Sequence, residues 1–355
     1  MELCCPACSA MLASQEDQLR CNLCGAAWPL IKGVPRFVES PYYWGELPRE
    51  LMQEVVHRAR QNGWREALEA LVAKDYPDIY RYVIDPIRAD FADQIPCGSD
   101  AVALDVGSGW GTISCLLATR YRHVVSVESV PERLDFMRVR ASQDALINIQ
   151  PIQADFLHLP IPASSCDVVV LNGVLEWVGI ASSEASPDAL QRQFLRKVWT
   201  CLRPNGWVYI GIENRFAFES FGGAIDHSGL PYTNLLPRRL ADWLVRWHTP
   251  RLQRTTQGSG VYRTYTHSYW GYKSLLRKAG FPDVRVCIVL PGYNHPVHFV
   301  PPGDHKALRA TLRQMHAAAS GHKRLALAVA SVVAPLGLQR LFAPCFGIFA
   351  CKRAV

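Results

Sequence analysis

Four cysteines near the N-terminus have the spacing of a metal site. Two Cys-x-x-Cys pairs, Cys5 with Cys8 and Cys21 with Cys24, are separated by twelve residues. Four thiolates in two such pairs can close a tetrahedron around Zn²⁺ and leave no open coordination position for catalysis. Cys4 could replace Cys5 at the cost of one more residue in the turn, but we prefer Cys5. The spacing predicts a structural zinc ribbon over residues 1–40, with ordinary reduced cysteines as the alternative.

A glycine-rich turn lies between an apolar run and an expected helix. Gly107, Gly109 and Gly111 follow the run 101–106, and Asp105 stands two residues ahead of the first glycine. Glycines at such a turn let the backbone bend sharply and approach a ligand at the carboxyl edge of a parallel sheet. A dinucleotide fingerprint would read GxGxxG, whereas the spacing here is GxGxG. We therefore expect a ligand other than a dinucleotide at this turn.

Acidic residues end the next two expected strands. The apolar run 124–127 ends in Glu128, and a strand expected over 149–156 ends in Asp155 and Phe156. Folds of this kind place a carboxylate for ribose hydroxyls at about the position of Glu128. A carboxylate can accept two hydrogen bonds from a vicinal diol and would repel the 2′-phosphate of NADP. The ligand at the turn should therefore contain a ribose without that phosphate.

The glycine turn and the two acids closely resemble the motifs of class I methyltransferases, which use S-adenosylmethionine. Residues 202–206, Leu-Arg-Pro-Asn-Gly, resemble the LxPGG turn of that family with Asn at one glycine position, and Asn tolerates the left-handed conformation. The resemblance implies a doubly wound, mostly parallel α/β fold with a seven-stranded Rossmann-like sheet. Its core would cover residues 97–290. S-adenosylmethionine would be the cofactor.

The resemblance also implies cofactor contacts. The glycine turn would contact the methionine part, Glu128 the ribose, and Asp155 the adenine amino group. Asn172 ends a buried strand expected over 166–172 and would open into the substrate side of the cleft. The implied cofactor-binding residues are Asp105, Gly107, Ser108, Gly109, Gly111, Glu128, Asp155, Phe156 and Asn172.

Polar and aromatic residues crowd the region of about 213–268, where class I methyltransferases insert substrate-recognition elements. The region resembles a group of bacterial surface-glycan and specialised-metabolite methyltransferases in the pairs Asn214-Arg215, Asp226-His227 and Arg263-Thr264. A late Pro-Asp-Tyr motif of that group reads Pro-Gly-Tyr here, at residues 291–293. The resemblance implies a small-molecule or glycan acceptor, and the arginines could bind its phosphate or carboxylate. The expected substrate-binding residues are Asn214, Arg215, Asp226, Arg263, Tyr265 and His267.

Methyl transfer to a hydroxyl requires a group that removes the proton. His227 is the best candidate because an imidazole titrates near neutrality, and the adjacent Asp226 could orient it, although neighbouring side chains point apart. A histidine satisfied within a loop is an equally good interpretation. Glu176 and Glu213 are alternative bases. The expected catalytic residues are therefore His227, Glu176 and Glu213.

Helical segments flank the expected core. Apolar residues recur every three to five positions over 50–71, with a break at Gly63, and a further helix is expected over 79–91. These helices form a linker or lid over residues 41–96.

A C-terminal extension is expected over 291–355. Helices are predicted over 305–315 and 323–341, and a final strand over 349–352. In the family that strand is inserted antiparallel beside the sixth, which we expect over 284–289.

Composition limits the class of protein. Hydrophobic residues make up 49% and charged residues 19% of the chain, which places it among globular proteins and excludes the disordered class. The cysteine pairs and the lack of an apolar N-terminal segment favour a reducing cytoplasm. The apolar stretch 325–338 is interrupted by Pro335 and is too short to span a bilayer, so we expect a packed helix, a dimer face or a membrane contact.

The net charge of +7 leaves room for an anionic partner, but no polybasic run stands out. We expect no DNA partner. The leading hypothesis is O-methylation of a small molecule or glycan in a biosynthetic pathway. One alternative is an RNA methyltransferase that uses the ribbon to bind RNA, and another is a non-catalytic scaffold that binds S-adenosylmethionine and activates a partner enzyme.

Overall fold

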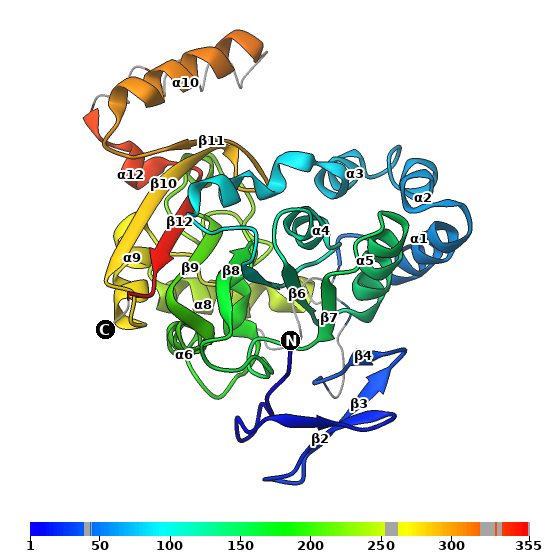
Figure 1. Ribbon diagram of the computed structural model, residues 1–355. Coiled ribbons are helices and arrows are strands. Elements are labelled where there is room, and N and C mark those ends of the chain that lie inside the picture. Colours follow the sequence, from blue (N-terminus) through cyan, green and yellow to red (C-terminus); the bar gives the residue numbers. More distant parts are fainter. Residues whose placement is uncertain (39–42, 44, 253–261, 320–330, 332–335, 354–355) are drawn as a thin grey trace. The chain divides into compact units, whose positions relative to one another are not determined.

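The computed structural model describes residues 1–38, 43, 45–252, 262–319, 331 and 336–353 (Figure 1). The described residues form two compact units. The first comprises Met1–Asn172, Phe194–Tyr209 and Cys351–Val355, and the second comprises Gly173–Gln193 and Ile210–Ala350. Strand β9 (Leu202–Glu213) runs through both units.

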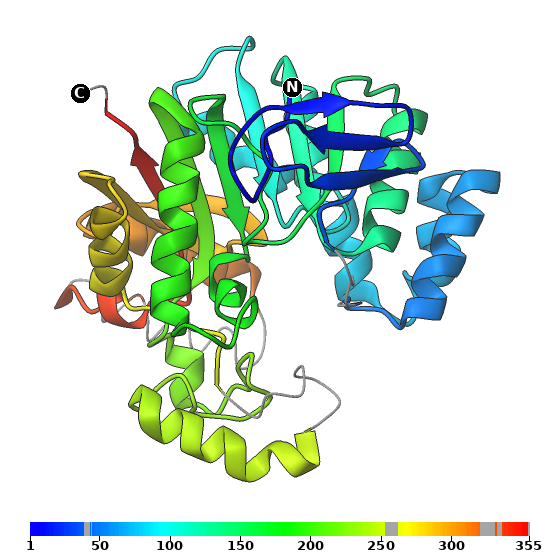
Figure 2. The same cartoon turned by 90° about the horizontal axis from the view of Figure 1, so that it is seen from below.

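A small antiparallel sheet opens the first unit. Its strands run side by side in chain order (Figure 2): β1 (Leu12–Ser14), β2 (Gln18–Cys21), β3 (Ala27–Ile31) and β4 (Val34–Pro35). Beyond β4, Arg36 forms a parallel bridge to Gln153, and the backbone N–H of Phe37 donates to the Gln153 carbonyl at 2.7 Å. The small sheet is thus tied by backbone hydrogen bonds to the larger sheet that follows.

A sheet in which β5 to β8 are parallel forms the core of the first unit. Its order is β9-β8-β5-β6-β7, with β5 (Val102–Val106), β6 (His123–Glu128), β7 (Ile149–Gln153) and β8 (Cys166–Asn172). All five residues of β5 are buried, as expected for a strand covered on both faces. Helices α4 (Thr112–Ala118) and α5 (Pro131–Gln143) lie against β6 and β7 (Figure 1).

A helical segment packs against this core. It contains α1 (Arg49–Asn62), α2 (Trp64–Leu71), α3 (Pro77–Ile84) and the 3₁₀ helix η1 (Pro86–Gln94). The break at Gly63, where φ is +110°, is confirmed. The single helix predicted over 79–91 is wrong, because Asp85 is extended ahead of Pro86, and the residue before a proline disfavours the helical conformation.

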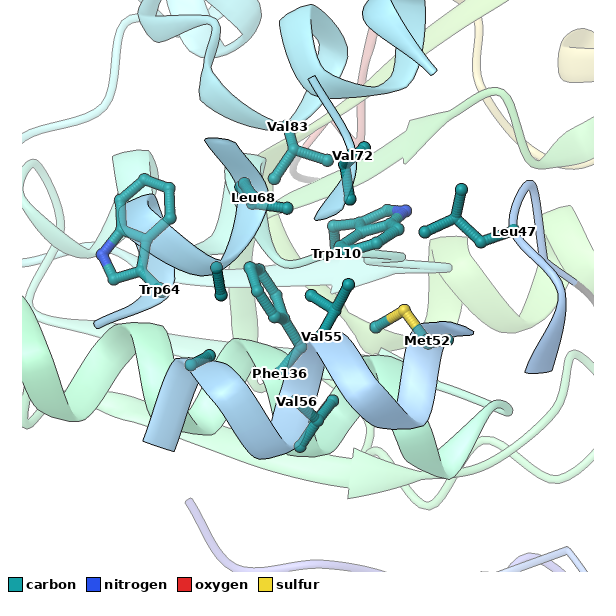
Figure 3. Close-up of a cluster of buried hydrophobic side chains, with 12 residues drawn as sticks. Leu47, Met52, Val55, Val56, Trp64, Leu68, Val72, Val83, Trp110 and Phe136 are labelled. Atoms are coloured by element: carbon teal, nitrogen blue, oxygen red, sulfur yellow. The ribbon is translucent and has the colours of Figure 1, made fainter. Parts of the chain in front are cut away.

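Trp110 joins the helical segment to the glycine-rich turn. Its side chain is buried and packs in a cluster with Phe136 of α5 and with apolar residues of α1 and α2 (Figure 3). The two rings meet edge to face, with centroids 5.1 Å apart. The residue inside the GxGxG turn therefore anchors the preceding helices.

The second unit adds strands in the order β11-β10-β12-β9. Strands β10 (Asp283–Gly292) and β11 (His295–Val300) form an antiparallel hairpin, and β12 (Cys345–Cys351) begins four residues earlier than predicted. Its helices are η2 (Leu175–Ile180), α7 (Phe218–Phe221), α8 (Arg238–Leu252), α9 (Tyr269–Lys278), α10 (His305–Ala318) and α12 (Gln339–Phe342); α6 (Pro187–Cys201) begins in this unit and ends in the first.

The described strands β5 to β12 are eight, one more than the seven predicted. The unpredicted strand is β11, and the two prolines and the glycine of 291–296 lie at the bulged end of its hairpin with β10. The sheet is large and mixed, since β10 and β11 are antiparallel and β5 to β8 are parallel.

Most of the helix predicted over 323–341 lies outside the described residues. Within the described part of the chain, every helix is too short or too polar to cross a membrane.

Gly111 is a position where a side chain should disturb the fold. Its φ is +75°, and a Cβ there would lie 2.0 Å from Met137 Cγ and 2.6 Å from Met137 Cβ. We expect Gly111→Ala to lower the free energy of unfolding by roughly 2 kcal/mol or more, through overpacking. Gly109→Ala is the matched control, because φ is also positive there (+55°) but the nearest atom is Tyr82 Oη at 3.9 Å. Urea unfolding of the two variants checks this, and equal losses would exclude the Met137 contact as the cause.

Candidate active site

The four cysteines of the small sheet lie together. Cys5 Sγ and Cys24 Sγ are 3.6 Å apart, Cys8 Sγ and Cys21 Sγ are 3.3 Å apart, and all four sulfur atoms lie within 4.8 Å of one another. Four sulfurs at about 2.3 Å from one Zn²⁺ would be separated by about 3.8 Å, so the observed spacing fits this ion. The sulfur of Cys4 is outside the group, which supports Cys5 as the ligand.

We therefore expect Cys5→Ser, but not Cys4→Ser, to reduce the zinc content of the purified protein. Loss of one of four thiolates should also lower the melting temperature, because a small ribbon takes much of its folding free energy from the metal. Metal analysis and thermal unfolding of both variants provide the measurement. Loss of zinc from Cys4→Ser alone would reassign the ligand.

The glycine-rich turn is fixed to the end of β6. The backbone N–H groups of Gly107 and Ser108 both donate to the Val127 carbonyl, at 2.8 and 3.0 Å. The Ser108 hydroxyl is buried and has no hydrogen-bond partner among the described residues. Beside Gly109 the nearest atom to an added Cβ would be 3.9 Å away. A ligand at this turn could therefore contact the Ser108 hydroxyl and approach the backbone at Gly109.

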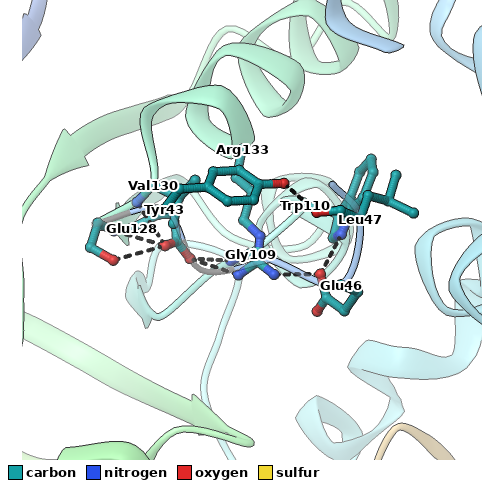
Figure 4. Close-up of polar contacts among 9 residues, drawn as sticks. Tyr43, Glu46, Leu47, Gly109, Trp110, Glu128, Val130 and Arg133 are labelled. Carbon is teal, nitrogen blue, oxygen red and sulfur yellow. Dashed lines mark hydrogen bonds and ion pairs between the residues drawn. The ribbon is translucent and has the colours of Figure 1, made fainter. Parts of the chain in front are cut away.

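Glu128 lies directly beside this turn (Figure 4). One carboxylate oxygen accepts a hydrogen bond from Gly109 N–H at 2.8 Å, and the other accepts from the N–H groups of Ser129 and Val130 at 2.8 and 3.0 Å. The residue is 5% exposed. Glu128, the predicted ribose contact, therefore lies at the glycine turn, and backbone N–H groups donate hydrogen bonds to its buried carboxylate.

The segment before α1 also reaches the turn (Figure 4). Glu46 forms an ion pair with Arg133 and accepts a hydrogen bond from the Trp110 indole at 3.2 Å. Arg133 lies 3.9 Å from the Glu128 carboxylate. The expected lid segment thus contacts Trp110 of the turn and Arg133 beside Glu128.

The other predicted cofactor residues have local partners. Asp105 is buried and accepts a hydrogen bond from the Ser114 hydroxyl at 2.6 Å, and burial raises the pKa of its carboxyl to about 7. The Asp155 carboxylate accepts from the backbone N–H groups of Leu157 and His158, which ends the strand earlier than the predicted 156. Phe156 packs on another ring, and Asn172 is buried at the end of β8. Their cofactor contacts stay predictions.

The three predicted catalytic residues meet in the second unit. Glu176 comes from η2, Glu213 from the end of β9, and His227 from the loop between α7 and α8. One side-chain oxygen or nitrogen of each lies within 4.8 Å of the others, and His227 Nε2 is 3.3 Å from Glu213 Oε2. Glu213 and His227 line a pocket of about 380 Å³. Sequence reasoning had treated the three as alternatives, whereas the structure makes them one cluster.

Burial and mutual charge set the protonation of this cluster. Burial raises the pKa of Glu176 to about 8, and the Glu213 charge adds to the rise. For His227, burial alone would lower the pKa, but the hydrogen bond to Glu213 and the charges of both glutamates raise it to about 9. Burial opposes ionisation of Glu213, yet the hydrogen bond and charge of His227 lower its pKa overall.

The surroundings of His227 differ in two respects from those of a free imidazole beside Asp226. Its pKa lies above neutrality, so the imidazole carries a proton at pH 7 and is no base in that state. Its partner is Glu213, because the Asp226 carboxylate accepts hydrogen bonds from Thr233 and from the N–H groups of Ser228 and Asn234 within its own turn.

The expected substrate-binding residues divide into two groups. Asn214 and Asp226 line the pocket with Glu213 and His227. The other four have local partners. The two arginines donate to backbone carbonyls: Arg215 to those of Asn234 and Leu236, and Arg263 to those of Gly179, Ser182 and Ala185. His267 Nε2 lies 2.8 Å from Gln191 Oε1, and the Arg238 guanidinium lies over the Tyr265 ring. Binding of the acceptor by these four residues stays a prediction, and their local hydrogen bonds and ring contact do not favour it.

Tyr293 is a site residue that sequence reasoning did not select. Its hydroxyl donates to Glu213 Oε1 at 2.7 Å, and it lines the same pocket. Tyr293 belongs to the Pro-Gly-Tyr run at 291–293, and the resemblance drew attention only to the Asp that Gly292 replaces.

The buried carboxyl of Glu176 should make the stability of the protein depend on pH. Its folded-state pKa of about 8 lies above the ordinary 4.5, so the wild-type protein should lose stability as pH rises from about 4.5 to 8. Glu176→Gln lacks this ionisation. After dialysis against metal-free buffer, the variant should match the wild type at pH 5 and exceed it at pH 8 by on the order of 1–3 kcal/mol. Chemical unfolding at both pH values gives the test, with the exposed Glu184→Gln as control; a less stable variant at pH 8 would mean that Glu176 is ionised and paired.

Comparison with known proteins identifies the central segment. Residues 104–210 match a family model described as a methyltransferase domain. A ubiquinone biosynthesis O-methyltransferase from Chromobacterium violaceum is 25% identical over 196 residues, which are 55% of this chain and 78% of that protein. The biotin biosynthesis bifunctional protein BioHC from Cellvibrio japonicus is 29% identical over 125 residues, which are 35% of this chain and only 22% of that protein.

Among solved structures, a phosphoethanolamine N-methyltransferase 2 from Haemonchus contortus in complex with S-adenosyl-L-methionine is 12% identical, with a TM-score of 0.45. The match covers 85% of this chain and 60% of that one. Residues 104–210 are thus similar to a methyltransferase domain, and the relatives that overlap with this segment include an O-methyltransferase.

Proposed function

We propose that this methyltransferase-domain chain transfers a methyl group from S-adenosylmethionine to a hydroxyl of a small-molecule or glycan acceptor. The observation that carries the proposal is the hydrogen bond from Gly109 N–H to Glu128, which holds a carboxylate beside an open glycine turn. Transfer to oxygen is supported by the similarity to a ubiquinone biosynthesis O-methyltransferase. A small acceptor is supported by the size of the pocket at Glu213 and His227, about 380 Å³.

The first unit would bind the cofactor, whose sulfonium group supplies an electrophilic methyl when bound. Glu128 would accept a hydrogen bond from a ribose hydroxyl at the oxygen that accepts from Gly109 N–H, because that oxygen has a second lone pair. The Ser108 hydroxyl has no protein partner among the described residues and would bind a polar atom of the ligand. Glu46 and Trp110 would close the outer side.

The second unit would bind the acceptor and take its proton. Glu213 is the ionised member of the cluster, and Tyr293 and His227 hold its two oxygens. At neutral pH the His227 proton stays in the ion pair with Glu213, so the pair would orient an acceptor hydroxyl, and the ionised Glu213 would accept its proton. Only towards pH 9 would His227 become the free base that the sequence suggested.

Gly109→Arg tests the cofactor site. The long side chain would fill the space next to the turn, and we expect at least a 100-fold loss of affinity for S-adenosylmethionine and S-adenosylhomocysteine in calorimetric titration. Gly98→Arg is the matched control, because Gly98 has no atom within 4 Å of an added Cβ and lies outside the turn. NADH should bind neither protein. Unchanged affinity in folded Gly109→Arg would refute this placement of the cofactor.

Transfer itself is tested with S-adenosylmethionine labelled in the methyl group and acceptor fractions from the source organism. Label in a neutral, base-stable methyl ether is the expected outcome. Label in RNA, with binding that weakens steeply with salt, would instead favour the RNA methyltransferase. Cofactor binding without transfer to any fraction would favour the scaffold.

A further inference from the structure

We propose that Glu176, Glu213 and His227 form a binding site for a divalent transition-metal ion such as Mn²⁺. The three side chains come from separate segments of the second unit, and one ligand atom of each lies within 4.8 Å of the others. The site is distinct from the cysteine cluster of the small sheet. Its role in methyl transfer rests on the proposed function, whereas the binding of the ion does not.

The distances suit a shared ion. Adjacent ligand atoms at about 2.1 Å from an octahedral metal are separated by about 3 Å. His227 Nε2 and Glu213 Oε2 are 3.3 Å apart, so this pair is already close to that spacing. A small rotation of the Glu176 side chain would complete the third position.

Glu176 provides an independent indication. It is completely buried, and neither carboxyl oxygen has a hydrogen-bond partner of normal geometry among the described residues. Because an uncompensated buried carboxyl is costly, such a group is expected where a ligand supplies the missing partner.

Charge balance favours a divalent cation. A bound ion would displace the protons of Glu176 and His227, and the resulting two carboxylates and one neutral imidazole carry a charge of −2, which a divalent ion neutralises. Carboxylate ligands suit Mn²⁺ and imidazole suits Fe²⁺ or Zn²⁺, so the mixed set fits a transition metal better than Ca²⁺. Three protein ligands leave open positions for water and for acceptor oxygens.

The pocket indicates what would occupy those positions. Glu213 and His227 line it together with Asn214, Asp226 and Tyr293, so an acceptor in the pocket would reach the ion. A bound hydroxyl would lose its proton to solvent more readily. Its oxygen would then bond to the methyl carbon as the carbon–sulfur bond breaks, and that electron pair would remain on sulfur, giving a methyl ether and S-adenosylhomocysteine. An acceptor with two adjacent hydroxyls, such as a catechol or a sugar diol, would fit two open positions.

The test is titration of the full-length protein with Mn²⁺ at pH 7.5, followed by the electron paramagnetic resonance signal of free Mn²⁺. Zinc content is measured first, so that the ribbon is known to be loaded. We expect one Mn²⁺ per chain, at least a tenfold weaker affinity in Glu176→Gln and His227→Gln, and unchanged affinity in Glu184→Gln. Circular dichroism confirms that each variant is folded.

The outcomes separate the two proposals, because cofactor binding is measured on the same samples. Mn²⁺ binding that depends on Glu176, without binding of S-adenosylmethionine, would keep the metal site and overturn the proposed function. No binding of Mn²⁺, and no second equivalent of Zn²⁺ or Fe²⁺, in folded wild-type protein would overturn the metal site. Equal binding by wild type and Glu176→Gln would also overturn it.

Discussion

The buried charge of Glu128 constrains the whole first unit. A carboxylate that is 5% exposed requires compensation, and here it comes from the backbone N–H groups of Gly109, Ser129 and Val130. These donors belong to the turns after β5 and β6, so one side chain fixes the geometry of two loops at the carboxyl edge of the sheet. Arg133 and Glu46 extend the same network to the segment before α1. The turn, the acid and the preceding helices therefore form one connected arrangement.

The sequence predicted those parts of the fold that depend on local pattern. The break at Gly63, the glycine turn and the four clustered cysteines all follow from residue type and short spacing. Strand β11 was missed because prolines and a glycine also form bulged hairpins, and only pairing with β10 distinguishes the two. The helix expected over 79–91 is interrupted at one position, where Asp85 precedes Pro86.

The sequence indicated which residues belong to the candidate sites, but not what surrounds their side chains. Glu176, Glu213 and His227 could each be named as a base, yet they are far apart in the chain, and only the fold brings their side chains together. Their protonation depends on that proximity, so a reference pKa for histidine misled the assignment of the base. Arg215 and Arg263 show the opposite case, because their charge suggested a ligand while backbone carbonyls are their actual partners.

The attachment of the small sheet at β7 has a consequence for solubility. Strand β7 is the last strand of the large sheet, and such an edge exposes unpaired backbone groups that can recruit strands from other molecules. The chain leaving the ribbon covers part of this edge, through the Arg36–Gln153 bridge and the hydrogen bond from Phe37. A ribbon that unfolds would release this cover and expose the edge of β7. Resistance to intermolecular strand pairing would then depend on the folded state of the small sheet rather than on the cofactor site.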